Sequence, residues 1–190
     1  MVRSCAAAIA LYALTCSAYA AEALKFRDID GRELPAASEA KATVVYFITN
    51  DCPISNQYAP AMNQICDDYA ERGVQCYLAY VDPDLTREQI EQHRAAYSHS
   101  RPAMLDSRHE LVERAGATVT PEAAVFDSQG ELAYLGRINN FYAKLGSPRR
   151  VVTEHDLRDA LDEMLAGKPV SNPKTQAVGC FVPTLDWKQQ

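Results

Sequence analysis

The distribution of apolar residues over positions 42–82 constrains the fold of this chain more than any other feature of its sequence. The run ATVVYFIT (42–49) is rich in β-branched and aromatic residues, which is typical of a buried central strand, and VQCYLAYVD (74–82) is a second such run. Between them, apolar residues recur every three or four positions, which predicts a helix over 54–72 with one apolar face. The three segments together predict a β-α-β unit.

Further elements follow in an order that is typical of an α/β domain. Thr86 with Gln89 three residues later forms a capping-box pattern, which predicts a helix that ends near residue 97. The stretch TPEAAVFDSQGELAYLGRI predicts a strand, a turn at DSQG and a second strand, and a last helix should begin near Thr153. We therefore expect one α/β domain over 21–166, followed by an extended tail over 167–190.

The first 20 residues have the pattern of a secretory signal peptide. Arg3 supplies a positive start, CAAAIALYALTC is a short apolar segment, and AYA at 18–20 matches a cleavage site. A lipoprotein signal with Cys16 as the modified residue is the alternative. No second long apolar segment follows, so we expect an exported protein, periplasmic or secreted from a bacterial cell envelope, with no membrane insertion after cleavage.

The charge pattern argues against nucleic acid as a partner. The formal net charge is −6, and acidic and basic residues are mixed along the chain. Binding to nucleic acid or to an anionic membrane surface would need a concentrated basic patch, which this sequence lacks. The partners should therefore be proteins or small molecules.

The cysteines that remain after cleavage are the candidate chemical groups. In TNDCPISN, Cys52 stands where a Cys-x-x-Cys motif would begin, but the fourth position is Ser55. Cys66 and Cys76 lie ten residues apart, at the end of the predicted helix and the start of the next strand, so we expect a structural disulfide worth about 3 kcal/mol. Two free buried thiols are the alternative. If that disulfide forms, Cys180 in the tail is the only thiol left for Cys52.

Several residues around Cys52 resemble the thioredoxin superfamily. Cys52 is followed by Ala59 and Pro60, as the first cysteine of a thioredoxin is followed by Ala-Pro, and Thr120-Pro121 resembles the superfamily's cis-proline loop. The resemblance implies a thioredoxin-like fold, with a central mixed β-sheet flanked by helices. It also implies that Pro121 is cis and lies beside Cys52.

Within the superfamily, the chain is similar to the exported redoxin and peroxiredoxin-like (AhpC/TSA-type) branch, with a single-cysteine CPIS motif. Thr49-x-x-Cys52 matches the end of the peroxiredoxin pattern, and the resemblance implies that the Thr49 hydroxyl bonds the sulfur. Two positions depart from family patterns. Val45 replaces the peroxiredoxin proline, and Tyr46 replaces the buried acid of thioredoxins, so peroxidase activity and proton transfer must be tested separately.

The position of Cys52 favours a reactive thiol. A helix N-terminus presents unpaired backbone N–H groups and a positive dipole, and both stabilise the thiolate. An inert, buried cysteine is the alternative reading. Ser55 cannot resolve a mixed disulfide, whereas Cys180 can, because the tail is long enough to cross the domain and its apolar neighbours Val178, Phe181 and Val182 favour docking. The alternative is a disordered tail whose cysteine is incidental.

These observations predict an exported thiol-disulfide oxidoreductase or a peroxiredoxin-like protein without a cofactor or a resident metal. Cys52 is the expected nucleophile and Cys180 the possible resolving cysteine. The expected partners are protein thiols and disulfides, or a small peroxide, together with an exported thiol reductant. The alternatives are a copper-binding metallochaperone that uses Cys52, Cys180 and His109, and a non-catalytic interaction module. The histidines at 93, 99 and 109 are expected at the surface or at helix caps.

Overall fold

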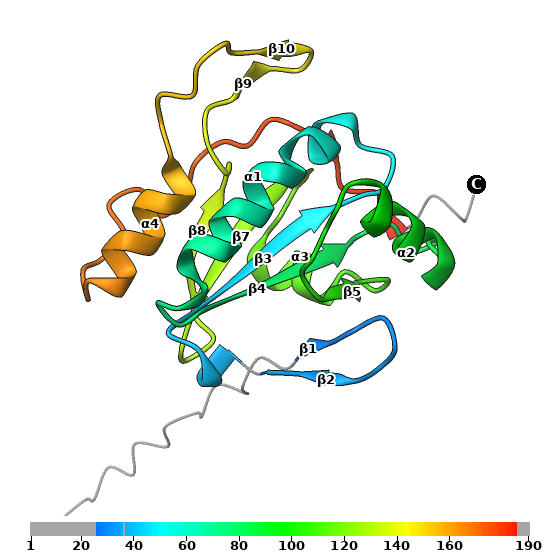
Figure 1. Ribbon diagram of the computed structural model, residues 1–190, viewed down its shortest axis with the longest axis horizontal. Helices are drawn as coiled ribbons and strands as arrows, with labels where there is room; N and C mark the ends of the chain where they lie inside the picture. The colour runs from blue at the N-terminus through cyan, green and yellow to red at the C-terminus, as the bar shows by residue number, and fades with distance from the viewer. Residues whose placement is uncertain (1–25, 36, 186–190) are drawn as a thin grey trace, which may run out of the picture.

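A five-stranded mixed β-sheet forms the centre of the protein (Figure 1). The computed structural model describes residues 26–35 and 37–185, so the predicted signal peptide at 1–20 lies outside the described residues. The strand order is β5-β4-β3-β7-β8. Strands β3, β4 and β5 run parallel, and β7 and β8 are antiparallel to their neighbours. The bounds are β3 (Ala42–Ile48), β4 (Val74–Tyr80), β5 (Ala103–Leu105), β7 (Glu122–Asp127) and β8 (Leu132–Gly136).

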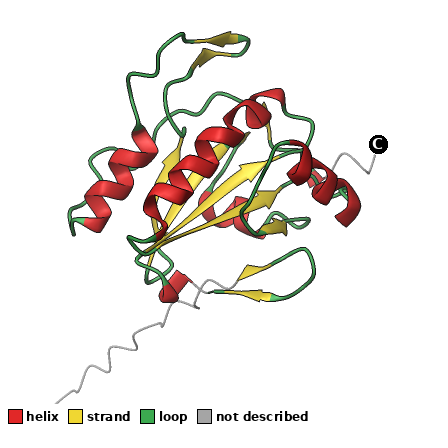
Figure 2. Cartoon of the chain, in the orientation of Figure 1, coloured by secondary structure: helices red, strands yellow, loops and turns green. Residues whose placement is uncertain are grey.

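Helices cover both faces of this sheet, as Figure 2 shows. Residues of α1 (Pro53–Ala70), α2 (Arg87–Ala96) and α4 (Asp156–Leu165) share one apolar cluster with one face. The short helix α3 (Glu110–Ala115) and the 3-10 turn η1 (Ala37–Glu39) pack on the other. The predicted thioredoxin-like α/β class is confirmed. None of the helices within 26–35 and 37–185 is long and apolar enough to span a membrane.

Strand β3 is the centre of the core because both of its faces are buried. All seven of its residues are inaccessible to solvent. Successive side chains of a strand point to opposite faces, so Val44 and Tyr46 join the cluster under α1 while Val45 and Phe47 join the cluster on the α3 side. This explains why the sequence of β3 is a continuous apolar run rather than an alternating one.

The sequence predicted the long elements but missed the shortest ones. The predicted helix at 54–72 corresponds to α1, and the capping box of Thr86 and Gln89 is present at the start of α2. The sequence missed strand β5 and helix α3, which have three and six residues. The other missed strands have two or three residues each and form three small pairs, which is too short for apolar periodicity to reveal. They are β1 (Phe26–Arg27) with β2 (Glu33–Leu34), β9 (Tyr142–Lys144) with β10 (Ser147–Pro148), and β6 (Val119–Thr120) with β11 (Cys180–Phe181).

The tail beyond α4 lies along the domain and is bonded to it at several points. The Glu163 carboxylate accepts hydrogen bonds from the backbone N–H and the hydroxyl of Ser171, at 2.7 and 2.6 Å. Lys174 then forms a bridge with Leu135 at the edge strand β8. A Cβ at Gly136 would overlap Thr175, so glycine is required for this close approach. The tail is therefore an ordered part of the fold up to residue 185.

A disulfide ties the end of α1 to strand β4. It joins Cys66 and Cys76, with a Cα–Cα distance of 6.0 Å, the pair that the sequence favoured. The hydroxyl of Tyr46 lies 3.9 Å from the Cys66 sulfur in the same buried layer. Among the described residues, the free cysteines are Cys52 and Cys180.

The expectation that the histidines at 93, 99 and 109 lie at the surface or at helix caps is wrong for His93 and His99, whereas His109 is the N-cap residue of α3. All three are at least nine-tenths buried. His93 Nε2 donates to the Asn56 side-chain oxygen, while its Nδ1 accepts from the Tyr80 hydroxyl, both at 2.8 Å, so the ring is held neutral. His99 packs 5.5 Å from the His93 ring, and its Nδ1 is buried without a hydrogen-bond partner.

This histidine pair predicts a loss of stability in mild acid. Burial, and then repulsion from His93 and Arg94, lowers the pKa of His99 from 6.5 to about 4. The unfolded chain therefore binds a proton near pH 6.5 that the folded chain refuses until about pH 4. The contribution of His99 to the free energy of unfolding is therefore complete above pH 6.5. It declines by up to about 3 kcal/mol as the pH falls to 4.

Urea unfolding at several pH values tests this prediction. His99→Gln should flatten the decline in free energy of unfolding between pH 6.5 and 4. The matched control, His155→Gln, changes an exposed histidine and should keep the slope of the unmodified protein. Equal slopes in the two variants would show that His99 does not control acid stability.

Candidate active site

Cys52 lies at the junction between β3 and α1, where the helix begins. It is the N-cap residue of α1, and its sulfur accepts a hydrogen bond from the Ser55 backbone N–H at 3.5 Å. Pro53 occupies the first turn, where a backbone N–H would have no acceptor within the helix. The N–H that proline lacks therefore costs no hydrogen bond there. The side chain is 1% exposed, so its sulfur faces the protein interior and the loop before β7.

The loop that faces Cys52 contains the Thr120–Pro121 peptide bond, which is cis. The Cys52 sulfur lies 3.1 Å from the Thr120 carbonyl oxygen, so a protonated Cys52 donates to that oxygen. Residues 52 and 120 are far apart in sequence, and the pairing of β3 with β7 brings them together. The predicted position of Pro121 beside Cys52 agrees with this geometry.

Cys180 reaches the same loop through a short antiparallel pairing. In the β11–β6 pair, Cys180 lies opposite Thr120 and Phe181 opposite Val119. The Thr120 hydroxyl donates to the Cys180 carbonyl at 3.5 Å, and the Val182 N–H donates to the Thr118 carbonyl at 3.0 Å. Thr120 therefore contacts both free cysteines, Cys52 through its carbonyl oxygen and Cys180 through its hydroxyl.

Gly179 makes this pairing possible. A Cβ at position 179 would overlap the carbonyl oxygen and carbon of Thr120. Any other residue would therefore push the tail away from the loop, and Cys180 with it. The glycine before Cys180 is a positional requirement of the site rather than a flexible hinge.

The two thiols influence each other's ionisation. Burial raises the pKa of Cys52, but hydrogen bonds from the Cys180 thiol and the Ser55 N–H outweigh it and leave that pKa below its ordinary value. The pKa of Cys180 is raised to about 12, first by burial, then by its hydrogen bond to Cys52 and by the negative charges of Cys52 and Asp51. Of the two thiols, Cys52 therefore ionises first. Cys180 keeps its proton and donates it in a hydrogen bond to the Cys52 sulfur.

Aromatic side chains that the sequence analysis did not single out surround the start of α1. The Tyr142 hydroxyl donates to the Gln57 side-chain oxygen at 2.6 Å, and Tyr58 packs against both Phe141 and Tyr142. Burial and the charge of Cys52 raise the pKa of Tyr142, so this phenol stays protonated beside the thiolate. The signal in the sequence was the pair Phe141-Tyr142, which sits in a stretch without apolar periodicity.

Thr49 and Ser55 contribute less to the sulfur than their positions suggested. Thr49 is 3% exposed, but no hydrogen bond joins its hydroxyl to Cys52 within the described part of the chain. The Ser55 hydroxyl is also buried, and it has no hydrogen-bond partner. Ser55 acts on Cys52 chiefly through its backbone N–H. A role for Thr49 stays a prediction.

The structure does not assemble the copper site that was considered. Across residues 26–35 and 37–185, no three His, Cys, Asp or Glu side chains are grouped so that they could hold a metal ion. His109 instead lies at the start of α3 and donates from Nε2 to the Val81 carbonyl at 2.7 Å. Cys52, Cys180 and His109 therefore do not form a ligand set.

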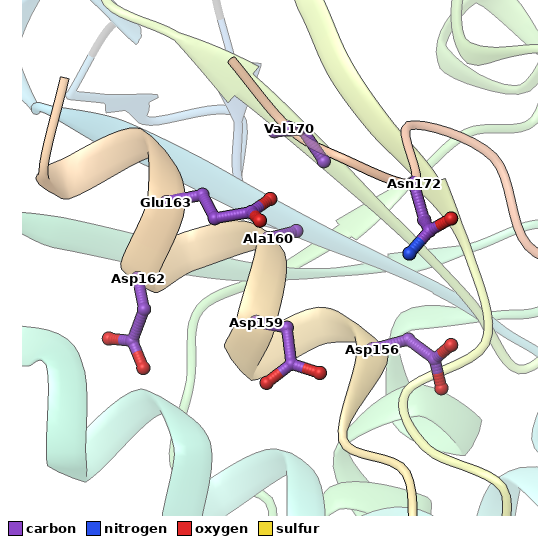
Figure 3. Close-up of a pocket in the computed structure, with 7 residues that line it drawn as sticks. All are labelled: Asp156, Asp159, Ala160, Asp162, Glu163, Val170 and Asn172. Atoms are coloured by element: carbon purple, nitrogen blue, oxygen red, sulfur yellow. The ribbon is translucent and has the colours of Figure 1, made fainter. Parts of the chain in front are cut away.

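A hollow beside α4 is strongly acidic, but three of the four carboxylates that line it have partners (Figure 3). Asp156 accepts from Arg137 at 2.7 Å, and Asp162 accepts from Arg72 at 2.6 Å. Glu163 bonds Ser171, as described above. These three carboxylates hold α4 and the tail in place, and Asp156 forms an ion pair with Arg137.

Comparisons with solved structures support the fold. A hypothetical protein from Sinorhizobium meliloti has 25% identity and a TM-score of 0.71, over 85% of this chain and 90% of its own. An uncharacterized conserved protein from Geobacillus kaustophilus has 23% identity and a TM-score of 0.71, over 86% and 89%. A secreted disulfide oxidoreductase from Mycobacterium tuberculosis, homologous to DsbE of E. coli, has 15% identity and a TM-score of 0.51, over 76% and 95%.

The sequence itself gives the family. No curated protein sequence matches the chain. The family model described as "AhpC/TSA family" matches residues 17–135, which is more than half of the chain and includes β3, α1, Cys52 and the cis-proline loop. The chain therefore belongs to the AhpC/TSA family, within the thioredoxin superfamily.

Proposed function

We propose that this protein is an exported thiol-disulfide oxidoreductase in which Cys52 is the nucleophile and Cys180 the resolving cysteine. The observation that carries the proposal is the β11–β6 pairing, which sets Cys180 opposite Thr120 while the Thr120 carbonyl contacts the Cys52 sulfur. The secreted disulfide oxidoreductase among the structural neighbours supports this reaction class and an exported location. Signal cleavage after residue 20, the domain at 21–166 and the tail at 167–190 belong to the same proposal.

The first step is attack by the Cys52 thiolate on a disulfide of a substrate protein. A Cys52–substrate disulfide forms, and the other substrate sulfur leaves as a thiolate. The helix N-terminus and the Cys180 thiol lower the pKa of Cys52, which increases the fraction of the thiolate that attacks. Pro121 and the Thr120 carbonyl border the sulfur and define the direction from which the substrate approaches.

The second step transfers the bond to Cys180. Once Cys52 is in the mixed disulfide, its negative charge and its hydrogen bond with Cys180 are gone, and these are two of the causes that raise the pKa of Cys180. Cys180 therefore ionises more readily at this stage and attacks the Cys52 sulfur, which releases the second substrate thiolate. Two electrons have then passed from the Cys52–Cys180 pair to the substrate, and an exported dithiol reductant restores the pair.

Membership of the AhpC/TSA family supports a small peroxide as the alternative substrate. The Cys52 thiolate would displace an alcohol or water from the O–O bond and become a sulfenic acid. Cys180 would then condense with it and release water. Both substrates lead to the same Cys52–Cys180 disulfide, so the roles of the two cysteines do not depend on the choice.

Access to Cys52 requires movement of the tail. The Cys52 side chain is 1% exposed while the tail is docked, and β11 pairs with β6 over only two residues. So short a pairing opens at a small free-energy cost compared with the domain core. The tail would detach to admit a substrate and redock to resolve it.

Peptide mapping of the acid-quenched, oxidised protein tests the pairing of the thiols. We expect a Cys52–Cys180 peptide alongside Cys66–Cys76. Reduction of a small neutral disulfide should be lost in Cys52→Ser, while Cys180→Ser should stop at a trapped mixed disulfide on Cys52. Full turnover by Cys180→Ser would instead make Cys52 a one-cysteine enzyme that an outside thiol resolves.

The rate of alkylation as a function of pH tests the shared proton. Cys52 should react with a thiolate pKa below that of an ordinary thiol, and Cys180→Ala should raise that pKa because the hydrogen-bond donor is lost. Cys180→Ser keeps a donor and should raise it less. An unchanged Cys52 pKa in Cys180→Ala would contradict the contact between the two thiols.

Gly179→Ala tests the docking of the tail. The added Cβ would overlap the Thr120 carbonyl, so the tail should shift and Cys180 should be alkylated at least about tenfold faster, as expected for a segment held by local opening. Asn172→Ala alters an exposed tail residue and should leave that rate unchanged. Equal rates in the two variants would indicate that the tail does not need glycine to dock.

A further inference from the structure

An open groove lies between the β9–β10 hairpin and the tail, directly beside Cys180. Figure 1 shows the hairpin projecting from the domain, with the tail passing close to its base. The groove has a volume of about 550 Å³, and two of the residues that line it, Gly179 and Phe181, flank Cys180 in the chain. Whatever binds in it lies next to the thiol pair.

The groove is basic in a chain that is acidic overall. Its lining includes Arg137, Lys144 and Arg149 and, among the described residues, no carboxylate. Arg137 is neutralised by Asp156, but Lys144 and Arg149 are exposed, and neither forms an ion pair within the described part of the chain. Two unpaired cations in a protein of net charge −6 favour an anionic occupant.

Apolar side chains share the groove with these cations. Phe181 is 84% exposed and Leu145 is 64% exposed, and both line it together with Tyr142 and Val178. Large apolar side chains that gather at one exposed site mark a surface that binds a partner. The occupant should therefore carry apolar groups beside its negative charges.

Both sides of the groove offer backbone groups to an extended chain. β9 pairs only with β10 among the described strands, so its other edge is unpaired. On the opposite side, residues 176–178 form no backbone hydrogen bond in the described structure. An extended peptide can satisfy such groups by strand addition, whereas a small molecule cannot.

We infer that this groove docks an extended acidic segment of the substrate protein whose disulfide Cys52 attacks. This inference rests on the proposed function and adds the class of substrate. Acidic side chains of the segment would meet Lys144 and Arg149, and its apolar side chains would cover Leu145 and Phe181. Gly179 and Phe181, which flank Cys180, line the groove, so a docked segment would present a neighbouring disulfide to the thiol pair.

Binding of a redox-inert peptide tests the groove separately from the chemistry. The probe is a fluorescent octapeptide of alternating Val and Glu, and its counterpart has Lys in place of Glu. The full-length protein should bind the Glu peptide at least about tenfold more tightly, and about 0.5 M salt should remove most of that difference. Lys144→Glu and Arg149→Glu should each weaken Glu-peptide binding about fivefold.

Lys168→Glu is the matched control, because Lys168 is an exposed tail residue that does not line the groove. It should bind the Glu peptide as the unmodified protein does, and circular dichroism should show that all three variants are folded. No preference for the Glu peptide, or an equal loss in all three variants, would overturn the docking proposal.

Two other results would overturn it and assign the groove to another occupant. Dimerisation that Arg149→Glu abolishes would assign the groove to a second copy of the chain. Displacement of the peptide by laurate at stoichiometric concentration would assign it to a lipid anion.

Turnover of a small neutral disulfide by the unmodified protein separates the two proposals. Turnover without a preference for the Glu peptide would retain the redox function and overturn the docking site. Selective peptide binding without turnover of either the small disulfide or hydrogen peroxide would retain the groove as a peptide site and overturn the redox function. A disulfide-bonded substrate built on the Glu peptide should be reduced with a lower KM than its Lys counterpart.

Discussion

The backbone pairing between β6 and β11 is the interaction on which the site depends. It fixes Cys180 opposite Thr120, and Thr120 is already in contact with Cys52 through its carbonyl. The pairing is only two residues long, so it relies on support elsewhere along the tail, at Leu135 and at Glu163. Two glycines, Gly136 and Gly179, give the tail its close approach. Order in an irregular segment here comes from spaced anchors rather than from regular secondary structure.

The sequence predicted the central fold well because its long elements carry strong patterns. β3 is buried on both faces, and its seven apolar or β-branched residues leave little ambiguity. α1 combines apolar periodicity with Pro53 and Cys52 at its start. The pairs β6–β11 and β9–β10 could not be predicted, since two or three residues show no periodicity and their partners are distant or irregular. The sequence did contain one signal for β11, a glycine and a cysteine between apolar residues of the tail.

The sequence suggested members for the candidate site but not the contacts between them. The distance that the tail can reach suggested Cys180, but the register with Thr120 and the dependence on Gly179 required coordinates. His93 and His99 were misplaced for a similar reason. His93 is buried because Tyr80 and Asn56, from two other elements, satisfy both of its nitrogens. Such partners become neighbours only in the tertiary structure, so a polar residue in sequence defaults to the surface.

Placing the second cysteine on the tail couples chemistry to docking in a way that a cysteine at position 55 would not. A Cys-x-x-Cys pair within one helix turn resolves a mixed disulfide as soon as it forms. Here Ser55 occupies that position with a buried hydroxyl that cannot form a disulfide, so in the proposed mechanism a mixed disulfide on Cys52 would persist until Cys180 returns. The residues that flank Cys180 also line the groove beside the hairpin. In that mechanism, a segment bound in the groove would lie against the strand that has to redock, and resolution of the mixed disulfide would become sensitive to what the groove holds.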